Sequence, residues 1–156
     1  MNTIIVEGGK DMGNRIYPIG IQNFEKIRKE GYVYVDKTAL MYKLVKSGSY
    51  YFLSRPRRFG KSLLISTLEA YFEAKRDLFE GLAVETLEKD WVKRPVFHLD
   101  LNIGKYDTPD SLDKILNETL DYWESLYGTR SAETTLALRF AGVVGRAYEQ
   151  SGERVA

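Results

Sequence analysis

The chain has no cysteine and a single histidine, His98, in 156 residues. Without thiols it can form neither a disulfide nor a thiolate metal centre, which fits a reducing compartment. No charge dominates either, because 23 lysines and arginines face 22 aspartates and glutamates and leave a net charge of +1. Such a chain has no overall field that attracts nucleic acid or an anionic membrane. Any electrostatic attraction must come from a local patch.

Long hydrophobic runs are also missing. No apolar stretch approaches membrane-spanning length, and residues 1–14 carry acidic and glycine positions where a secretory leader has basic and then apolar ones. We therefore expect a cytoplasmic protein without contact to membranes. With 44% hydrophobic and 29% charged residues, the composition is that of a globular domain. We expect residues 1–15 to form a flexible tail and residues 16–156 to belong to one domain.

The most informative segment is residues 54–62, S-R-P-R-R-F-G-K-S. It follows an aromatic and apolar run, residues 50–54, which favours a buried strand. The apolar positions after it have helical spacing: Leu63, Leu64, Leu68, Tyr71 and Phe72. A turn between a strand and a helix offers backbone N–H groups to an anion. A phosphate-binding loop has this setting, with Lys61 reaching the β and γ phosphates and the Ser62 hydroxyl ligating Mg²⁺.

The first half of this loop departs from the pattern G-x-x-x-x-G-K-[ST], because Arg55 stands where that pattern has glycine. Pro56 has no N–H to offer a phosphate and pushes Arg55 toward an extended backbone. We expect guanidinium groups of Arg57 or Arg58 to replace some backbone donors. The residues that we assign to nucleotide binding are Arg55, Pro56, Arg57, Arg58, Phe59, Gly60, Lys61, Ser62 and Leu63.

The rest of the chain alternates between strand and helix patterns. Strands are expected over residues 32–35, 50–54 and 96–101, with another beginning at residue 153. Helices are expected over residues 23–29, 36–46 and 84–89, from the Thr108-Pro109 start signal to Gly128, and after Ser131 up to Gly152. The order predicts an α/β fold with a mostly parallel sheet flanked by helices.

Several single residues have structural interpretations in this fold. Asp36 is expected to cap the helix that follows it, and His98 to be a buried core residue of its strand. Tyrosines at strand spacing are expected to pack the sheet: Tyr32, Tyr34, Tyr50 and Tyr51. Gly142 and Gly145 are unusual inside a helix and indicate close packing or a break.

Three segments together resemble one protein family: Y-P-I-G-I-Q-N-F at residues 17–24, Y-V-D-K-T at 34–38, and R-P-R-R-F-G-K-S at 55–62. They are similar to the AAA-ATPase-like proteins common in gut and anaerobic bacteria, in which the arginine-bearing loop is the usual form. The resemblance runs from Tyr17 onward. It implies a P-loop NTPase domain that uses ATP and Mg²⁺, often followed by a restriction-endonuclease-like nuclease domain.

The resemblance also implies an acidic Walker B motif in a strand that would follow Val155. We therefore expect the chain to be the N-terminal part of the domain, truncated before that strand, and to hydrolyse ATP poorly or not at all. Asp100, at the end of the apolar run 96–99, is a second candidate for an Mg²⁺ contact. Alternatively, Asp100 caps or pairs with residues of its own loop.

Three functions stay open at this point. The first is an ATP-binding domain that is an ATPase in the full-length protein. The second is a nucleic-acid-binding module whose arginine loop holds backbone phosphates, although the net charge argues against a large footprint. The third is a non-catalytic interaction module with a degenerate loop.

Overall fold

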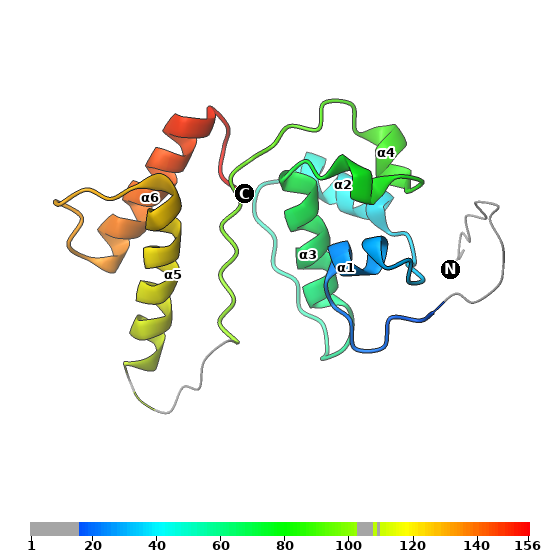
Figure 1. The fold of residues 1–156 in the computed structure, drawn as a ribbon, viewed down its shortest axis with the longest axis horizontal. Helices are drawn as coiled ribbons and strands as arrows, with labels where there is room; N and C mark the ends of the chain where they lie inside the picture. The colour runs from blue at the N-terminus through cyan, green and yellow to red at the C-terminus, as the bar shows by residue number, and fades with distance from the viewer. Residues whose placement is uncertain (1–15, 103–107, 109) are drawn as a thin grey trace. The chain divides into compact units, whose positions relative to one another are not determined.

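The computed structural model describes residues 16–102, 108 and 110–156. These residues hold six α-helices and one 3-10 helix: α1 (Phe24–Lys29), α2 (Thr38–Ser47), α3 (Lys61–Phe72), η1 (Arg76–Phe79), α4 (Ala83–Leu87), α5 (Ser111–Tyr127) and α6 (Leu136–Ser151) (Figure 1). The chain divides into two compact units, Met1–Val92 and Lys93–Ala156. None of the helices in the described part is long and apolar enough to cross a membrane.

The expected α/β fold with a parallel sheet is wrong, because the described residues contain no β-strand. Residues 32–35, 50–54 and 96–100 run between the helices as extended or irregular chain, and so do residues 153–156 after the last helix. Aromatic and apolar residues favour a strand, but a strand exists only where a second one pairs with it. Tyr50 and Phe52 illustrate this, since their side chains are 96% and 94% exposed. His98, expected inside a strand core, is exposed as well.

In the second unit, the hydrogen bonds of the described residues show one short pairing of two extended segments. It involves the C-terminal residue, Ala156. The Ala156 N–H donates to the Pro95 carbonyl, and the Ala156 carbonyl accepts from the Phe97 N–H, both at 2.9 Å. Two hydrogen bonds at a single residue are too few to make a strand. The expected strand at residue 153 is therefore reduced to this one contact.

The first unit is built on helices that the sequence predicted well. Asn23 caps α1 by accepting a hydrogen bond of 2.7 Å from the Lys26 N–H, and α2 ends at Gly48. The helices enclose a core that contains the fully buried Phe79 ring, in contact with Phe24 at 4.9 Å and Trp91 at 5.2 Å between ring centroids. The other buried members are Met41, Ala70, Tyr71, Leu78, Leu82 and Val84.

Asp36, expected as the N-cap of α2, lies one residue before the N-cap position, which is Lys37, but its carboxylate still binds N–H groups at the starts of two helices. One oxygen, Oδ1, accepts from the Thr38 N–H at 2.8 Å and from the Thr38 hydroxyl at 2.7 Å. The other, Oδ2, accepts from the Ala83 N–H at 2.7 Å, while Thr38 Oγ1 accepts from the Val84 N–H at 3.0 Å. The same two side chains thus satisfy the first N–H groups of both α2 and α4.

Glu88 is a second residue whose buried side chain links helices through hydrogen bonds and an ion pair. Its carboxylate accepts a hydrogen bond from the Tyr71 hydroxyl of α3 and lies 3.0 Å from the Lys46 ammonium of α2. It also accepts from the Lys89 and Asp90 N–H groups at 2.9 and 3.1 Å. Burial raises the pKa of this carboxyl, but the hydrogen bonds from Tyr71 and Lys46 outweigh it and lower the pKa from 4.5 to about 2.

The second unit packs α5 against α6. Phe97 stacks on Trp123 with 4.5 Å between ring centroids, and Leu120 and Val143 complete the centre of this core. Helix α5 ends at Gly128 and α6 at Gly152, as expected. However, α6 begins at Leu136 and not directly after Ser131, because Thr135 supplies the cap by accepting from the Leu138 N–H at 3.3 Å. The Pro109 part of the α5 start signal lies outside the described residues.

Gly142 and Gly145 lie within an unbroken α6, so the expected break is wrong, and the expected close packing is found at Gly142 but not at Gly145. At Gly142 a Cβ atom would lie 2.0 Å from the Glu133 Oε1 atom, which pairs with the buried Arg146 guanidinium. At Gly145 a Cβ atom would meet nothing within 4 Å. Gly142 therefore leaves the space that the Glu133–Arg146 ion pair occupies.

The lowered pKa of Glu88 predicts that the stability of the protein falls at acid pH. A carboxyl whose folded pKa is depressed stabilises the protein above its unfolded pKa of 4.5, and this stabilisation is lost as the pH falls toward about 2. We expect the wild type to lose on the order of 2 kcal/mol of unfolding free energy through this group between about pH 5 and about pH 2. Urea unfolding over this range should show a smaller loss for Glu88→Gln. The exposed Glu80→Gln is the control, and equal acid slopes for wild type and Glu88→Gln would contradict the assignment.

The two glycines of α6 predict opposite effects of the same substitution. Gly142→Ala should lower the unfolding free energy by about 1–3 kcal/mol, since the new methyl group displaces Glu133 from the buried Arg146. Gly145→Ala should raise it by up to about 1 kcal/mol, because alanine is the better helix former and has room there. Urea denaturation of both variants measures this. A Gly142→Ala protein as stable as Gly145→Ala would show that Glu133 does not need the space.

Candidate functional site

The loop before α3 is open to solvent over its whole length. Every residue from 54 to 60 is exposed. Gly60 precedes the helix with a left-handed backbone at φ 74°, and Arg58 is also left-handed at φ 67°. The N–H groups in the first turn of any α-helix have no partner within the helix. In this described segment no side chain caps α3 in their place. This end of the helix is available to an anion.

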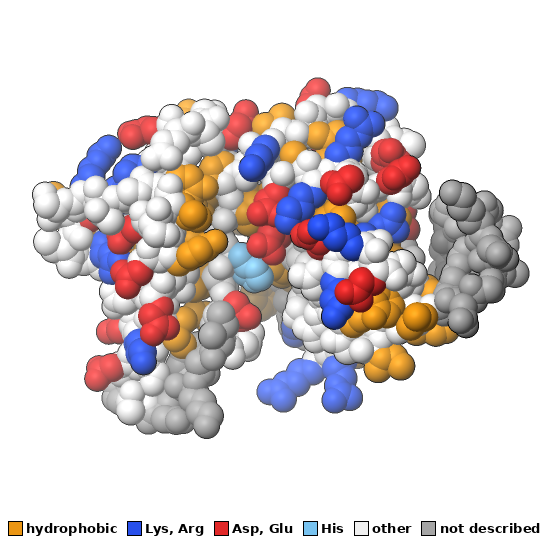
Figure 2. All heavy atoms as spheres, viewed as in Figure 1, with side chains coloured by type: hydrophobic (Ala, Val, Ile, Leu, Met, Phe, Trp, Pro, Cys, Tyr) orange, Lys and Arg blue, Asp and Glu red, His pale blue; other side chains and the backbone are white. Residues whose placement is uncertain are grey.

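Lys61 spans the two ends of the loop. It is the first residue of α3, and its ammonium donates a hydrogen bond back to the Arg55 carbonyl. Ser62 follows on the same exposed first turn. The structure thus brings together Gly60, Lys61 and Ser62 at the helix start, with Arg55 facing them across the loop. The guanidinium groups of Arg57 and Arg58 belong to exposed residues, and Figure 2 shows Lys and Arg side chains projecting from the edge of the first unit where Figure 1 draws this loop.

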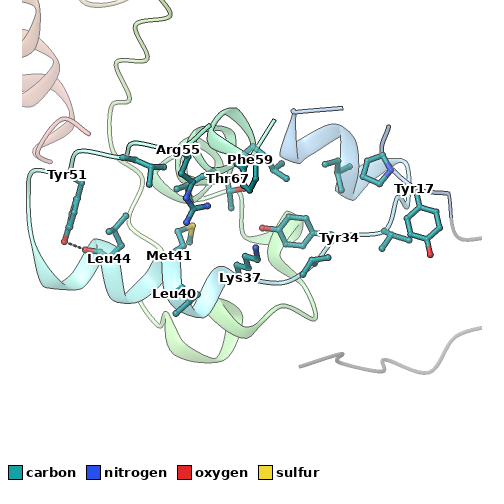
Figure 3. Close-up of a pocket in the computed structure, with 18 of the residues that line it drawn as sticks. Tyr17, Tyr34, Lys37, Leu40, Met41, Leu44, Tyr51, Arg55, Phe59 and Thr67 are labelled. Atoms are coloured by element: carbon teal, nitrogen blue, oxygen red, sulfur yellow. Dashed lines mark hydrogen bonds between the residues drawn. The ribbon is translucent and has the colours of Figure 1, made fainter. Parts of the chain in front are cut away.

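A pocket of about 490 Å³ lies beside the loop (Figure 3). The loop contributes Arg55, Phe59 and Gly60 to its lining. Its other walls come from α1, α2 with the residue before it, α3 and three extended segments: Ile27, Lys37, Leu40, Met41, Leu44, Leu63, Leu64, Thr67, Tyr17, Pro18, Val33, Tyr34, Val35, Tyr51, Phe52 and Leu53. Figure 3 shows the Arg55 side chain reaching toward Met41, with Lys37 and the Tyr34 ring beside this space.

The pocket is mainly apolar, but six of its lining residues carry a polar side-chain end. Two have cations, Lys37 and Arg55, and four have hydroxyls: Tyr17, Tyr34, Tyr51 and Thr67. Burial raises the pKa of the Tyr34 phenol, so it stays neutral at physiological pH. The Thr67 hydroxyl donates to the Leu63 carbonyl at 2.7 Å and is also hydrogen-bonded to the Tyr34 hydroxyl. Small-molecule sites combine an apolar wall with a few polar groups in this way.

Comparison with known proteins identifies the family. A family model described as "Predicted AAA-ATPase" matches residues 18–156. The chain belongs to this AAA-ATPase-like family. A relative from Azotobacter chroococcum mcd 1, named "Uncharacterized protein in vnfD 5'region", is 39% identical over 146 residues, which are 92% of this chain and 28% of that protein. No solved structure matches.

The AAA-ATPase-like chain therefore spans less than a third of the curated relative that it matches. The matched residues include the whole loop and every lining residue of the pocket except Tyr17. Family membership suggests the use of a nucleotide and Mg²⁺. The nine residues assigned to nucleotide binding, Arg55 to Leu63, remain a prediction that these comparisons do not test.

Asp100, the second candidate Mg²⁺ ligand of this AAA-ATPase-like chain, lies in the second unit and is held by its own loop. Its Oδ1 atom accepts from the Asn102 N–H at 2.8 Å and from Asn102 Nδ2 at 2.9 Å. These hydrogen bonds lower the pKa of the Asp100 carboxyl, which is therefore charged at neutral pH. Among the described residues no three side chains of His, Cys, Asp or Glu gather as a metal site. The metal role of Ser62 and Asp100 stays a prediction.

Sequence reasoning found the loop and missed most of the pocket. Of the lining residues, Arg55, Phe59, Gly60 and Leu63 were among the assigned nucleotide-binding residues. Met41 and Thr67 were not, because an apolar or small residue on a helix face has the pattern of an ordinary core position. The available signal was the clustering of Tyr34 and Lys37 in the segment Y-V-D-K-T, whose Asp36 and Thr38 serve the fold.

Proposed function

We propose that this domain binds ATP with Mg²⁺ at residues 55–63, with the phosphates on the first turn of α3. The observation that carries the proposal is the position of Lys61, whose ammonium lies against the Arg55 carbonyl at the mouth of an uncapped helix start. A triphosphate would take the place of that carbonyl as the partner of Lys61. A charged phosphate is the stronger hydrogen-bond acceptor of the two.

The other loop residues have complementary roles in this proposal. The left-handed Gly60 begins the turn into α3, whose first N–H groups, those of Lys61, Ser62 and Leu63, would bind the phosphates. The Ser62 hydroxyl would ligate Mg²⁺, and the exposed Arg57 and Arg58 would neutralise phosphate charge. Pro56 and Phe59 fix the course of the loop between these groups. Hydrolysis would in addition require a carboxylate that orders Mg²⁺ and water.

Thermal unfolding with Mg²⁺-ATP tests the proposal. A ligand that binds only the folded state stabilises it, by about 1.4 kcal/mol at roughly ten times the Kd. We expect the Tm of the wild type to rise by roughly 3–6 °C under these conditions and the Tm of Lys61→Ala not to change. Lys43→Ala, which removes an exposed lysine of α2 that does not line the pocket, should shift as the wild type does.

The same measurement separates the alternatives. A wild type that ATP does not stabilise, but that a single-stranded oligonucleotide stabilises in a manner lost at high salt, would favour the nucleic-acid-binding module and contradict the proposal. A wild type that neither ligand stabilises would favour a degenerate loop in an interaction module. A shift that persists in Lys61→Ala would place the nucleotide elsewhere.

A further inference from the structure

We propose that Tyr51 is a positioning residue for the phosphate-binding loop, and that it holds the start of the loop on the C-terminal end of α2. This inference rests on the proposed function and adds to it a residue outside those assigned to nucleotide binding. The exposed loop begins at Ser54, shortly after Tyr51 in the chain. The position of Tyr51 therefore determines where Arg55 comes to face Lys61.

The loop and the segment before it are not held by backbone hydrogen bonds. In the part of the chain that the structure describes, no backbone–backbone hydrogen bond joins residues 50–59 to another segment. The hydrogen bonds that fix the two ends of this segment come from side chains. At the C-terminal end, the Lys61 ammonium donates to the Arg55 carbonyl. At the N-terminal end, the hydroxyl of Tyr51 has this role.

Tyr51 reaches the last turn of α2 through this hydroxyl (Figure 3). The hydroxyl donates to the Leu44 carbonyl and lies 3.1 Å from the Ser47 hydroxyl, which donates to the same carbonyl at 3.3 Å. The last four carbonyls of an α-helix have no partner within the helix. The Leu44 carbonyl is one of these, because α2 ends at Ser47. The two hydroxyls therefore close the end of α2 and attach Tyr51 to it.

Gly48 leaves the space that this contact needs. A Cβ atom at this position would lie 2.7 Å from the hydroxyl oxygen of Tyr51 and 3.2 Å from the ring carbon that carries it. The backbone of Gly48 is extended, with φ −169° and ψ 178°, and alanine adopts this conformation without strain. Gly48→Ala therefore displaces the Tyr51 hydroxyl from Leu44 without changing Tyr51 or the loop itself.

Isothermal titration with Mg²⁺-ATP tests this role in two variants. Tyr51→Phe removes the hydroxyl and keeps the ring, which lines the pocket. We expect the Kd for Mg²⁺-ATP to rise about three- to tenfold, because binding must then also order a loop that is fixed at one end only. Gly48→Ala should raise the Kd to a similar extent. The titrations are made at a temperature at which circular dichroism shows each variant to be folded, so that a loss of stability alone leaves the Kd unchanged.

The double variant shows whether the two substitutions act through the same contact. If they do, Gly48→Ala should have little further effect on the Kd once Tyr51→Phe has removed the hydroxyl. The matched controls are Tyr50→Phe, which removes the hydroxyl of an exposed neighbour, and Gly145→Ala in α6, where a Cβ atom meets nothing within 4 Å. Both controls should bind Mg²⁺-ATP as the wild type does.

The outcomes separate this inference from the proposed function. A wild type that binds Mg²⁺-ATP, together with an unchanged Kd for Tyr51→Phe, would overturn the positioning role and leave the phosphate loop standing. Additive effects of Tyr51→Phe and Gly48→Ala would show that they do not share one contact, which also contradicts the inference. A wild type that does not bind Mg²⁺-ATP would overturn the proposed function, and this inference with it.

Discussion

The carboxylate of Asp36 and the hydroxyl of Thr38 satisfy the starts of two helices at once, and the geometry of the first unit depends on them. A five-residue helix such as α4 has no stability of its own, so its first N–H groups must be fixed from outside. These side chains lie 46 or more residues before the N–H groups that they hold. Asp36 and Thr38 flank Lys37 in the sequence and define where α2 begins. They therefore also position Lys37, Leu40 and Met41, which line the pocket.

Helix α3 is held along its length in a way that leaves its first turn free. Its Ser66 hydroxyl accepts from the Phe24 N–H at 2.9 Å, and Tyr71 near its C-terminal end is bonded to the buried Glu88. Both contacts lie beyond the first turn, where Lys61 and Ser62 are exposed. A rigid helix therefore presents an uncapped N-terminus on a loop that needs no contact with the core.

The sequence was sufficient to predict an element where the interaction that decides it joins residues close together in the chain. The ends of α1, α5 and α6 follow from Asn23, Gly128 and Gly152, whose caps join residues a few positions apart. The strand predictions were wrong because strand pairing depends on segments that are distant in the sequence. The apolar run around Tyr50 has the same composition whether or not another strand pairs with it. The start of α6 lay between two good caps, Ser131 and Thr135. The later one leaves Glu133 outside the helix, where it can pair with Arg146.

The same distinction applies to the candidate site. The loop could be located because Gly60, Lys61 and Ser62 are contiguous, whereas the pocket is assembled from segments that look like core when taken singly. Arg55 of the loop lies among mostly apolar residues in the pocket lining, so the site carries local positive charge although the net charge of the chain is only +1. A long nucleic acid gains from many cations spread along its backbone. A short polyphosphate with one ring attached gains from a few cations next to a single apolar pocket, and this combination favours a nucleotide as the ligand.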